Sequence, residues 1–204
     1  SGFDFIRKLN KLPSLNQNIF TFGSLNNFRK ISNDVVETWS KILHEVPNSK
    51  LILKSSTACD NDSLLNKFKK FKVDHKIEIL RQLDFIKKED HLKVYNRIDL
   101  CLDTFPYNGV TTTFESLWMN VPALVLKGYN FNSRCGESIM KNAKCDYFIA
   151  KNKTEYVEKA LYLSQNKEKL INYREKIFQT ILSSSLFDTK KFTQNFQNLL
   201  LNLL

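Results

Sequence analysis

The sequence contains few of the residues that mark non-globular proteins. Only five glycines and four prolines occur among 204 residues, which excludes collagen-like and low-complexity chains. The longest apolar run, 199–204 with Asn202 inside it, is far below the ~20 residues that span a bilayer. A signal-peptide pattern is also absent from the amino terminus. We therefore expect one globular domain that does not enter a membrane.

Cysteine is scarce as well, and its spacing argues against two common kinds of site. The four cysteines are Cys59, Cys101, Cys135 and Cys145, and no pair has the C-x-x-C spacing of zinc and redox sites. Cys101 lies in an apolar run, where cysteine usually behaves as a small buried hydrophobe. We expect a cytoplasmic protein with reduced thiols and no metal site.

Several ligand-binding signatures are missing. The sequence has no Walker P-loop, no G-x-G-x-x-G and no H-E-x-x-H, and the second of these absences argues against an NAD enzyme. Asp60-Asn61-Asp62 could hold a divalent cation that bridges two phosphates. It leads into a helix predicted from Ser63, however, and Asp and Asn commonly cap helices there. We favour the capping role.

The charge is strongly one-sided. Lysine and arginine outnumber aspartate and glutamate by 31 to 21, giving a formal net charge of +10. Such a chain suits a polyanion, whether nucleic acid, anionic lipid or a nucleoside diphosphate, and charge alone does not choose among them. The densest cluster, best explained as a solvated helix face, is Lys67, Lys69, Lys70 and Lys72. A non-enzymatic RNA-binding module is one alternative, but no recognisable motif interleaves aromatic with basic residues.

What the sequence does contain is an alternation of short apolar runs and amphipathic helices. Apolar runs without polar alternation are typical of strands buried on both faces. The predicted strands are 19–23, 51–53, 77–80, 100–102 and 123–126, with a further one near 147–149. The predicted helices are 34–44, 63–71, 89–97, 111–119, 132–142, 155–163, 167–182 and 190–203. This order specifies the α/β class, with a Rossmann-like doubly wound parallel sheet and helices on both faces. We assign it to residues 18–204 and treat 1–17 as a lead-in segment.

Sheets of this kind bind ligands beyond the carboxyl ends of their strands. Residues 23–31 follow the first strand, precede a helix and include Lys30. A lysine in that place could neutralise a diphosphate leaving group as a point charge. The alternative is an ordinary loop with a solvated lysine, and on this segment alone that alternative is favoured.

A second candidate, residues 103–115, follows the fourth strand directly. Asn108-Gly109 predicts a tight turn. The next helix opens with three hydroxyl-bearing residues, Thr111, Thr112 and Thr113. A helix start exposes free N–H groups and suits a phosphate, while Glu115, one turn further on, could accept from a ribose hydroxyl. The alternative is a threonine-capped helix without a ligand, although three threonines exceed what a cap needs.

The third candidate is His91 in the polar run 87–91. A histidine near a helix start beside the crevice could stack on a base or bond to it. A lone histidine is more often structural or merely exposed, so that alternative is favoured on this residue alone.

Several segments resemble one family in the same order. Residues 22–31, Phe-Gly-Ser-Leu-Asn-Asn-Phe-Arg-Lys-Ile, resemble the F-G-S-F-N-N-x-x-K-I stretch of the protein O-GlcNAc transferase family and its SPINDLY-like plant relatives. Residues 102–109 and 111–119 resemble that family's most recognisable segment. The resemblance continues through 133–136, 149–152 and 184–188, so that it covers about 18–204. Several ordered motifs are far more specific than one.

The resemblance implies the carboxyl-terminal half of a B-type glycosyltransferase, in which two Rossmann-like halves enclose the active site. That half holds the donor nucleotide, most often UDP-GlcNAc, and the sugar goes to protein serine or threonine. Some relatives use GDP-fucose, which leaves a protein O-fucosyltransferase as an alternative. Known members need no metal or other cofactor. The amino-terminal half and the helical TPR repeats, which usually select the protein acceptor, lie outside this sequence.

The resemblance also implies roles for individual residues. Asn27 and Lys30 would contact the diphosphate, and Lys30 would act in catalysis. His91 would contact the base with Lys88 nearby, and Lys54 is a weaker assignment. The remaining nucleotide-binding positions are Asn108, Gly109, Thr111, Thr112, Thr113 and, toward the ribose, Glu115. Val110 stands where the animal enzymes have histidine, so a phosphate or sugar contact is expected to be lost. Glu115 likewise replaces their aspartate.

Overall fold

The computed structural model describes residues 7–54, 61–81 and 88–203. Within them six parallel strands form one sheet: β1 (Phe20–Ser24), β2 (Ser49–Lys54), β3 (Ile77–Leu80), β4 (Leu100–Leu102), β5 (Ala123–Leu126) and β6 (Ile149–Ala150). The strand order is β3-β2-β1-β4-β5-β6, so that the chain reverses its direction of travel across the sheet between β1 and β4. This is the doubly wound order, and it confirms the predicted fold class.

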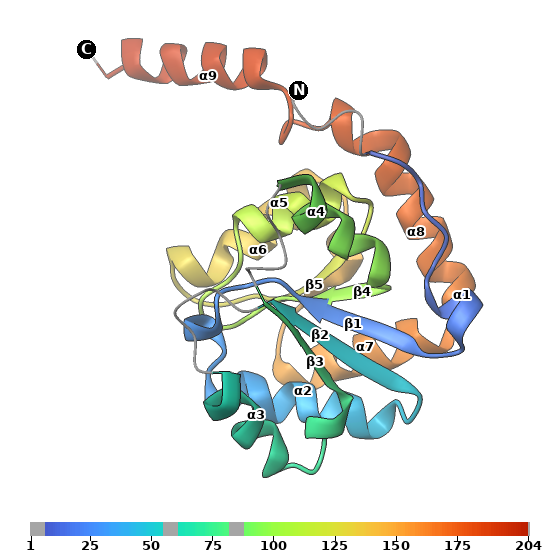
Figure 1. The fold of residues 1–204 in the computed structure, drawn as a ribbon. Helices are drawn as coiled ribbons and strands as arrows, with labels where there is room; N and C mark the ends of the chain where they lie inside the picture. Colours follow the sequence, from blue (N-terminus) through green and yellow to red (C-terminus); the bar gives the residue numbers. More distant parts are fainter. Residues whose placement is uncertain (1–6, 55–60, 82–87, 204) are drawn as a thin grey trace.

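Helices cover both faces of the sheet (Figure 1). One face carries α4 (Lys88–Lys93), α5 (Thr111–Trp118) and α6 (Phe131–Asn142), and the other carries α2 (Asn33–Glu45), α3 (Asn61–Lys69) and α7 (Lys153–Gln165). The helix α8 (Lys167–Thr180) and the short α1 (Ser14–Gln17) lie beside one end of the sheet. The last helix, α9 (Thr189–Leu201), extends away from the body.

The apolar runs of the sequence form the centre of the sheet. Every residue of β1 is buried, and Leu51, Ile52 and Leu53 of β2 have no exposed surface. The helices on the two faces of the sheet turn apolar side chains toward this layer; in α2, Val35, Trp39 and Ile42 are fully buried. That helix begins where Ser32 Oγ accepts from the Val35 N–H, which makes Ser32 its N-cap. Burial of these side chains is the main stabilising contribution.

The amino end of β4 is closed by residues from three other parts of the chain. Asp99, just before β4, is fully buried, and its carboxylate accepts from the backbone N–H groups of Ser14 (3.1 Å) and Thr21 (2.7 Å). Arg174 of α8 is also buried and donates to the carbonyls of Ile98 and Asp99. The predicted lead-in segment therefore packs against the domain from Arg7 onward, with Leu12 in the core.

Most predicted elements are confirmed to within a few residues, with small shifts. The sixth strand is Ile149–Ala150, preceded by a 3-10 turn at Asp146–Phe148. The predicted helix 89–97 is α4 followed by a 3-10 turn at Val94–Arg97. Cys101 is buried, as expected. Among the described residues, no helix is both long and apolar enough to cross a membrane.

Candidate functional site

Two loops meet at the carboxyl edge of the sheet, where the strand order reverses between β1 and β4. The loop after β1 contains a 3-10 turn, Phe28–Lys30, and the loop after β4 leads into α5. Lys30 Nζ donates to the Asn108 carbonyl at 2.9 Å and lies 4.2 Å from the ring centroid of Tyr107. The two segments that the sequence proposes as diphosphate contacts therefore lie against each other.

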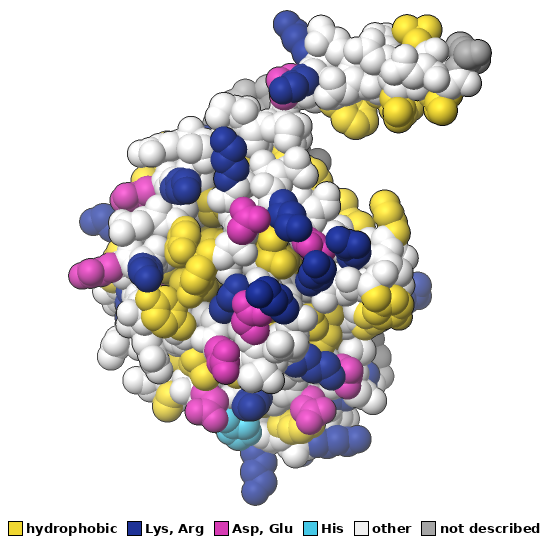
Figure 2. All heavy atoms as spheres, turned by 180° about the vertical axis from the view of Figure 1, so that it is seen from behind, with side chains coloured by type: hydrophobic (Ala, Val, Ile, Leu, Met, Phe, Trp, Pro, Cys, Tyr) yellow, Lys and Arg dark blue, Asp and Glu magenta, His cyan; other side chains and the backbone are white. Residues whose placement is uncertain are grey.

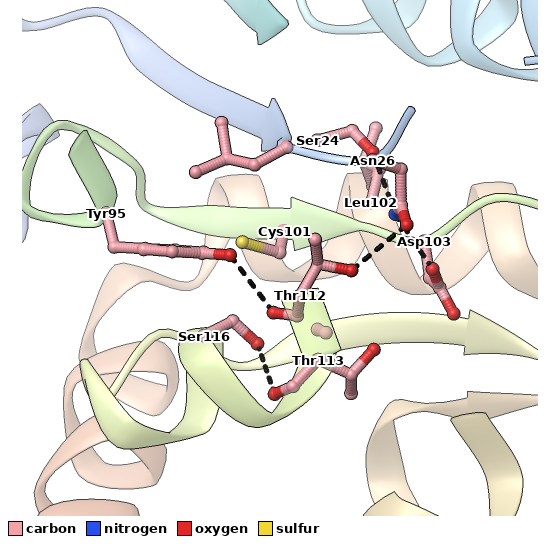
Figure 3. A pocket seen from close by; sticks show the side chains of 11 residues that line it. Ser24, Asn26, Tyr95, Cys101, Leu102, Asp103, Thr112, Thr113 and Ser116 are labelled. Atoms are coloured by element: carbon pink, nitrogen blue, oxygen red, sulfur yellow. Dashed lines mark hydrogen bonds between the residues drawn. The ribbon is translucent and has the colours of Figure 1, made fainter. Parts of the chain in front are cut away.

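A buried carboxylate joins these loops from below. Asp103, the first residue after β4, is 3% exposed, and its Oδ1 accepts three hydrogen bonds. The donors are the N–H groups of Thr104 (2.9 Å) and Gly109 (2.8 Å) and the side-chain amide of Asn26 (3.1 Å). Asn26 Oδ1 in turn accepts from Thr112 Oγ1 at 3.0 Å. Figure 3 shows this series of hydrogen bonds between the loop after β1 and α5. The network fixes the first turn of α5 relative to β1.

The start of α5 carries no side-chain cap. Its N-cap residue is Val110, whose side chain has no atom that can accept a hydrogen bond. The interpretation of this segment as a threonine-capped helix is therefore wrong. Thr112 Oγ1 donates to Asn26 and Thr113 Oγ1 to the Gly109 carbonyl, while Thr111 is exposed. In the described part of the chain nothing accepts from the backbone N–H of Thr111 or Thr112. These donors carry the partial positive charge of the helix start.

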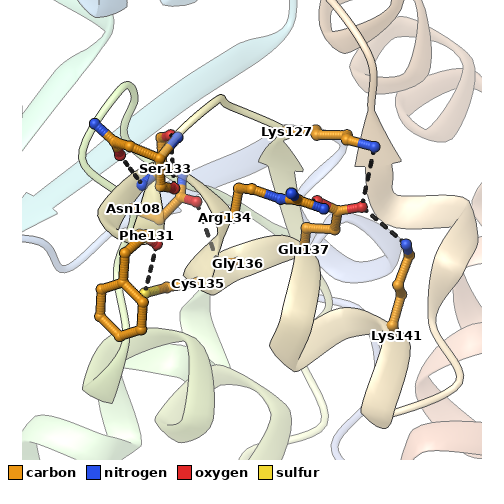
Figure 4. Close-up of polar contacts among 10 residues, drawn as sticks. Asn108, Lys127, Phe131, Ser133, Arg134, Cys135, Gly136, Glu137 and Lys141 are labelled. Atoms are coloured by element: carbon orange, nitrogen blue, oxygen red, sulfur yellow. Dashed lines mark hydrogen bonds and ion pairs between the residues drawn. The ribbon is translucent and has the colours of Figure 1, made fainter.

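The neighbouring helix α6 differs in this respect. Asn130 and Ser133 form a reciprocal cap, in which Asn130 Oδ1 accepts from the Ser133 N–H and Ser133 Oγ accepts from the Asn130 N–H. Further along, the buried Glu137 pairs with three basic residues (Figure 4): Lys127, Arg134 and Lys141. These partners hold the pKa of Glu137 down to about 2. The first turn of α6 thus has a side-chain cap, whereas that of α5 has none among the described residues.

The predicted tight turn at Asn108-Gly109 is wrong. The chain bends earlier, over 105–107, and Gly109 does not have a positive φ. Asn108 is instead a buried linker: its side chain donates to the Thr104 carbonyl and accepts from the Gly136 N–H of α6. Gly109 is needed for space, because a Cβ there would lie 2.3 Å from Thr112 Oγ1 and 2.9 Å from Asp103 Oδ1.

A second polar group lies between the end of β2 and α5. His91 of α4 is held between Lys54 Nζ, 2.9 Å from its Nδ1, and Glu115 Oε2, 3.0 Å from its Nε2. An ammonium can only donate, so Nδ1 is the acceptor and Nε2–H donates to Glu115. Tyr95 adds a second donor to the same carboxylate oxygen at 3.3 Å. His91, Lys54 and Glu115 thus form one ordered group beside the open start of α5.

Burial shapes the electrostatics of this edge. Partial burial lowers the pKa of Lys30, and the nearby Asp103 opposes that shift. Burial likewise lowers the pKa of Lys54, with Glu115 opposing it. For Asp103 burial dominates over its hydrogen bonds and raises the pKa to about 7. A weakly hydrated lysine beside unpaired helix N–H groups is a favourable place for an anion.

The other sequence-derived positions lie around this centre or beyond the described residues. Asn27 is exposed, and its Oδ1 accepts from the Arg29 N–H, capping the 3-10 turn. Lys88 is the first residue of α4, and only its backbone is described. Asp60 lies outside the described residues, while Asn61 and Asp62 form the first residues of α3. In the described ranges, no three His, Cys, Asp or Glu side chains cluster as metal ligands would.

Two residues that organise the site are missing from the sequence-derived set. Asn26 and Asp103 are both buried polar residues placed just after adjacent parallel strands. That position was the available signal, because polar residues following neighbouring buried strands come together at the sheet edge. Their side chains do not face the solvent. They connect the two loops by hydrogen bonds. Together with Thr112 and Tyr95 they also line a cavity of about 10 Å³ (Figure 3).

Sheet order and helix placement define the class of protein. The fold is that of the carboxyl-terminal half of B-type glycosyltransferases. The structure of Staphylococcus aureus TarM has this fold, with a TM-score of 0.67 at 14% identity over 94% of this chain and 37% of that one.

Glycosyl transferase family 41 matches residues 6–196, and the chain belongs to this family. A probable UDP-N-acetylglucosamine–peptide N-acetylglucosaminyltransferase SPINDLY of Solanum lycopersicum is 36% identical over 198 residues, covering 92% of this chain and 20% of that protein. A mutant Thermobaculum terrenum O-GlcNAc transferase superposes with a TM-score of 0.83 at 29% identity, over 95% of this chain and 38% of that one. The chain thus spans about a fifth of the length of the curated plant relative.

Proposed function

We propose that this chain is the donor-binding half of a glycosyltransferase that moves N-acetylglucosamine from UDP-N-acetylglucosamine to serine or threonine of a protein. The observation that carries the proposal is the contact of Lys30 with Asn108, in the loop that leads into the uncapped start of α5 at the switch point of the sheet. The names of the plant relatives and of the Thermobaculum enzyme support the same donor and acceptor class.

The chemistry follows from where charge develops. As the bond between the sugar and the diphosphate breaks, negative charge accumulates on the leaving phosphate. The ammonium of Lys30 and the N–H groups of Thr111 and Thr112 are fixed before the reaction, so they stabilise that charge without reorganisation. In this proposal Lys30 is the catalytic residue of the chain, and Asn27 reaches the diphosphate by leaving its local cap. These groups supply the positive charge, so the reaction needs no metal.

The ordered group of His91, Lys54 and Glu115 is proposed to hold the nucleoside. His91 presents its ring beside the open helix start, with Lys88 at the beginning of the same helix. Glu115 accepts from His91 and Tyr95 through one oxygen. We propose that its carboxylate also receives a ribose hydroxyl. The acceptor protein is proposed to bind through a second half and helical repeats of the whole enzyme, working in the cytoplasm.

An RNA-binding role for the basic chain has less support. Lys30 and Lys54 converge on the same sheet edge, as a nucleotide site requires. On the face shown in Figure 2, basic side chains are interspersed with acidic ones and do not form a continuous stripe.

Calorimetric titration of the chain with UDP and with GDP tests the proposal and separates the two donor classes. We expect saturable binding, preferentially of UDP, and a loss of about tenfold or more in affinity in Lys30→Met, because a charge-assisted contact contributes roughly 1.5–3 kcal/mol. Lys69→Met, an exposed lysine at the end of α3, is the matched control and should bind like the wild type. A folded chain that saturates with neither nucleotide would contradict the proposal, and preference for GDP would reassign the donor.

A further inference from the structure

One carboxylate oxygen in the site is both buried and without a partner. Asp103 Oδ1 accepts three hydrogen bonds, but Oδ2 has no hydrogen-bond partner in the described part of the chain and no solvent contact. It faces α6, where a Cβ on Gly136 would lie 3.1 Å away. A bare, buried carboxylate oxygen is costly when it is charged, and it is the natural place for a proton.

Two of the three hydrogen-bond donors on Asp103, Gly109 and Asn26, adjoin the segments that would meet the phosphates. Gly109 is the residue before Val110, the N-cap of α5. Asn26 accepts a hydrogen bond from Thr112 in the first turn of that helix. A diphosphate bound by Thr111, Thr112 and Lys30 therefore places new negative charge close to a carboxylate that water does not screen. The diphosphate would also attract the ammonium of Lys30, a cation whose charge lowers the pKa of Asp103 against the effect of burial.

The other titratable groups around Asp103 do not offset this. Tyr95, Cys101 and Tyr156 are buried around it, and burial raises the pKa of each, so they stay neutral. Glu115 on α5 is a second acidic group on the same side, and Cys135 lies near Lys30. Burial has already raised the pKa of Asp103 to about 7, so its proton occupancy is balanced in the neutral range.

We propose that Asp103 is a proton-linked positioning residue of the donor site, which takes up a proton on Oδ2 when a nucleoside diphosphate binds. The protonated side chain keeps Oδ1 as the acceptor of its three donors, so the loop geometry is retained while one negative charge is removed from beneath the phosphates. No bond other than O–H forms, and the proton comes from solvent. This inference rests on the proposed nucleotide-binding function.

The test is UDP titration calorimetry at pH 7.5 in buffers of different ionisation enthalpy, in which the slope of the observed enthalpy gives the protons taken up. At that pH the terminal phosphate of UDP is mainly ionised. We expect the wild type to take up roughly half a proton per UDP, because the added charge shifts the carboxyl group from mostly ionised toward neutral. Asp103→Asn, which preserves the Oδ1 acceptor, should bind UDP with an uptake near zero.

Asp99→Asn is the matched control, because Asp99 is a buried carboxylate at the other end of the same strand. It should keep the wild-type uptake. Zero uptake in the wild type with saturable binding, or unchanged uptake in Asp103→Asn, would overturn the inference and leave the proposed function standing. Failure of UDP and GDP to bind a folded wild type would remove both.

A second measurement uses the wild type alone, so that it tests the inference even if Asp103→Asn does not fold. If binding takes up a proton, the dissociation constant of the wild type must weaken as pH rises above about 7, by up to tenfold per pH unit. A dissociation constant that stays constant between pH 7 and 9 would also overturn the inference.

Discussion

A buried aspartate lies at each end of β4. We interpret Asp99 as a structural carboxylate and Asp103 as part of the proposed donor site. Asp99, at the amino end, has both oxygens in use, on the N–H groups of Ser14 and Thr21, with the buried Arg174 nearby. Asp103, at the carboxyl end, accepts three hydrogen bonds on Oδ1, while its Oδ2 has no partner among the residues that the structure describes. Burial raises the pKa of both carboxyl groups, so burial alone does not distinguish a structural carboxylate from one in a functional site.

The difference lies in what surrounds each carboxylate. Asp99 ties together β1, the segment before it and α8, all of which are packed elements. Asp103 ties together two loops and a helix start that still has unpaired N–H groups. At the amino end both carboxylate oxygens of Asp99 are satisfied within the chain and help to stabilise the fold, whereas the N–H groups of Thr111 and Thr112, which have no partner among the described residues, are available to a ligand.

The largest expected effect is a loss of stability when the buried contacts at the amino end of β4 are disrupted. Arg174→Met removes the cation beside Asp99 and leaves a buried carboxylate uncompensated, which should lower the free energy of unfolding by about 3–5 kcal/mol. Urea denaturation at pH 8 measures it. Because burial raises the pKa of Asp99 and the loss of Arg174 removes a charge that opposes this rise, protonation of Asp99 should make the loss smaller as the pH falls. Nucleotide affinity of the remaining folded protein should not change, and a selective loss of affinity would contradict the division between the two ends.

The next effect concerns the stability contributed by Asp103 across the pH range. Its pKa is about 7 in the folded chain against an ordinary 3.8, so the folded state binds the proton more tightly than the unfolded state between those values. This contribution is fully present below about pH 4 and is lost as pH rises to 7, by roughly 4 kcal/mol at most. Urea denaturation from pH 4 to 8 should show this decline in the wild type and a flatter profile in Asp103→Asn. Identical profiles would show that Asp103 titrates normally.

A smaller effect is expected at the carboxyl end of β4, where a substitution of Gly109 should change both stability and UDP affinity. Gly109→Ala forces a Cβ against Thr112 Oγ1, Asn26 Oδ1 and Asp103 Oδ1, and such overpacking costs about 1–3 kcal/mol of stability. The same clash displaces the start of α5, so UDP affinity should fall by roughly tenfold. Thermal unfolding and calorimetry measure the two quantities. Full affinity in the variant would show that the first turn of α5 does not hold the nucleotide.

Local patterns were sufficient for most of the fold. The buried runs at 51–53 and 100–102 and the apolar face of α2 predict their elements because burial on both faces leaves a strand without polar residues. The segments after β1 and β4 were identified for the same reason, since parallel strands bring their carboxyl ends together. The roles assigned to Lys30, His91 and Glu115 stay predictions that the titrations address.

The misses share a physical cause. Asn108-Gly109 is a frequent turn pair, but here Asn108 is buried and its side chain bonds Thr104 and α6. Three threonines look like a cap, but Thr112 and Thr113 are drawn away by Asn26 and the Gly109 carbonyl. In both cases a partner distant in sequence, or a carbonyl on the adjoining turn, outcompetes the local hydrogen bond that the dipeptide or triplet favours.

The sequence by itself determined the alternating order of strands and helices and the two segments that come to the switch point, because periodicity and chain direction are local properties. The tertiary structure decided which polar atoms are satisfied there. Within the described ranges it paired Lys30 with the Asn108 carbonyl, left the start of α5 without a side-chain cap and buried one oxygen of Asp103 without a partner. Those outcomes depend on contacts between residues up to about eighty positions apart, whose geometry exists only once the sheet has formed.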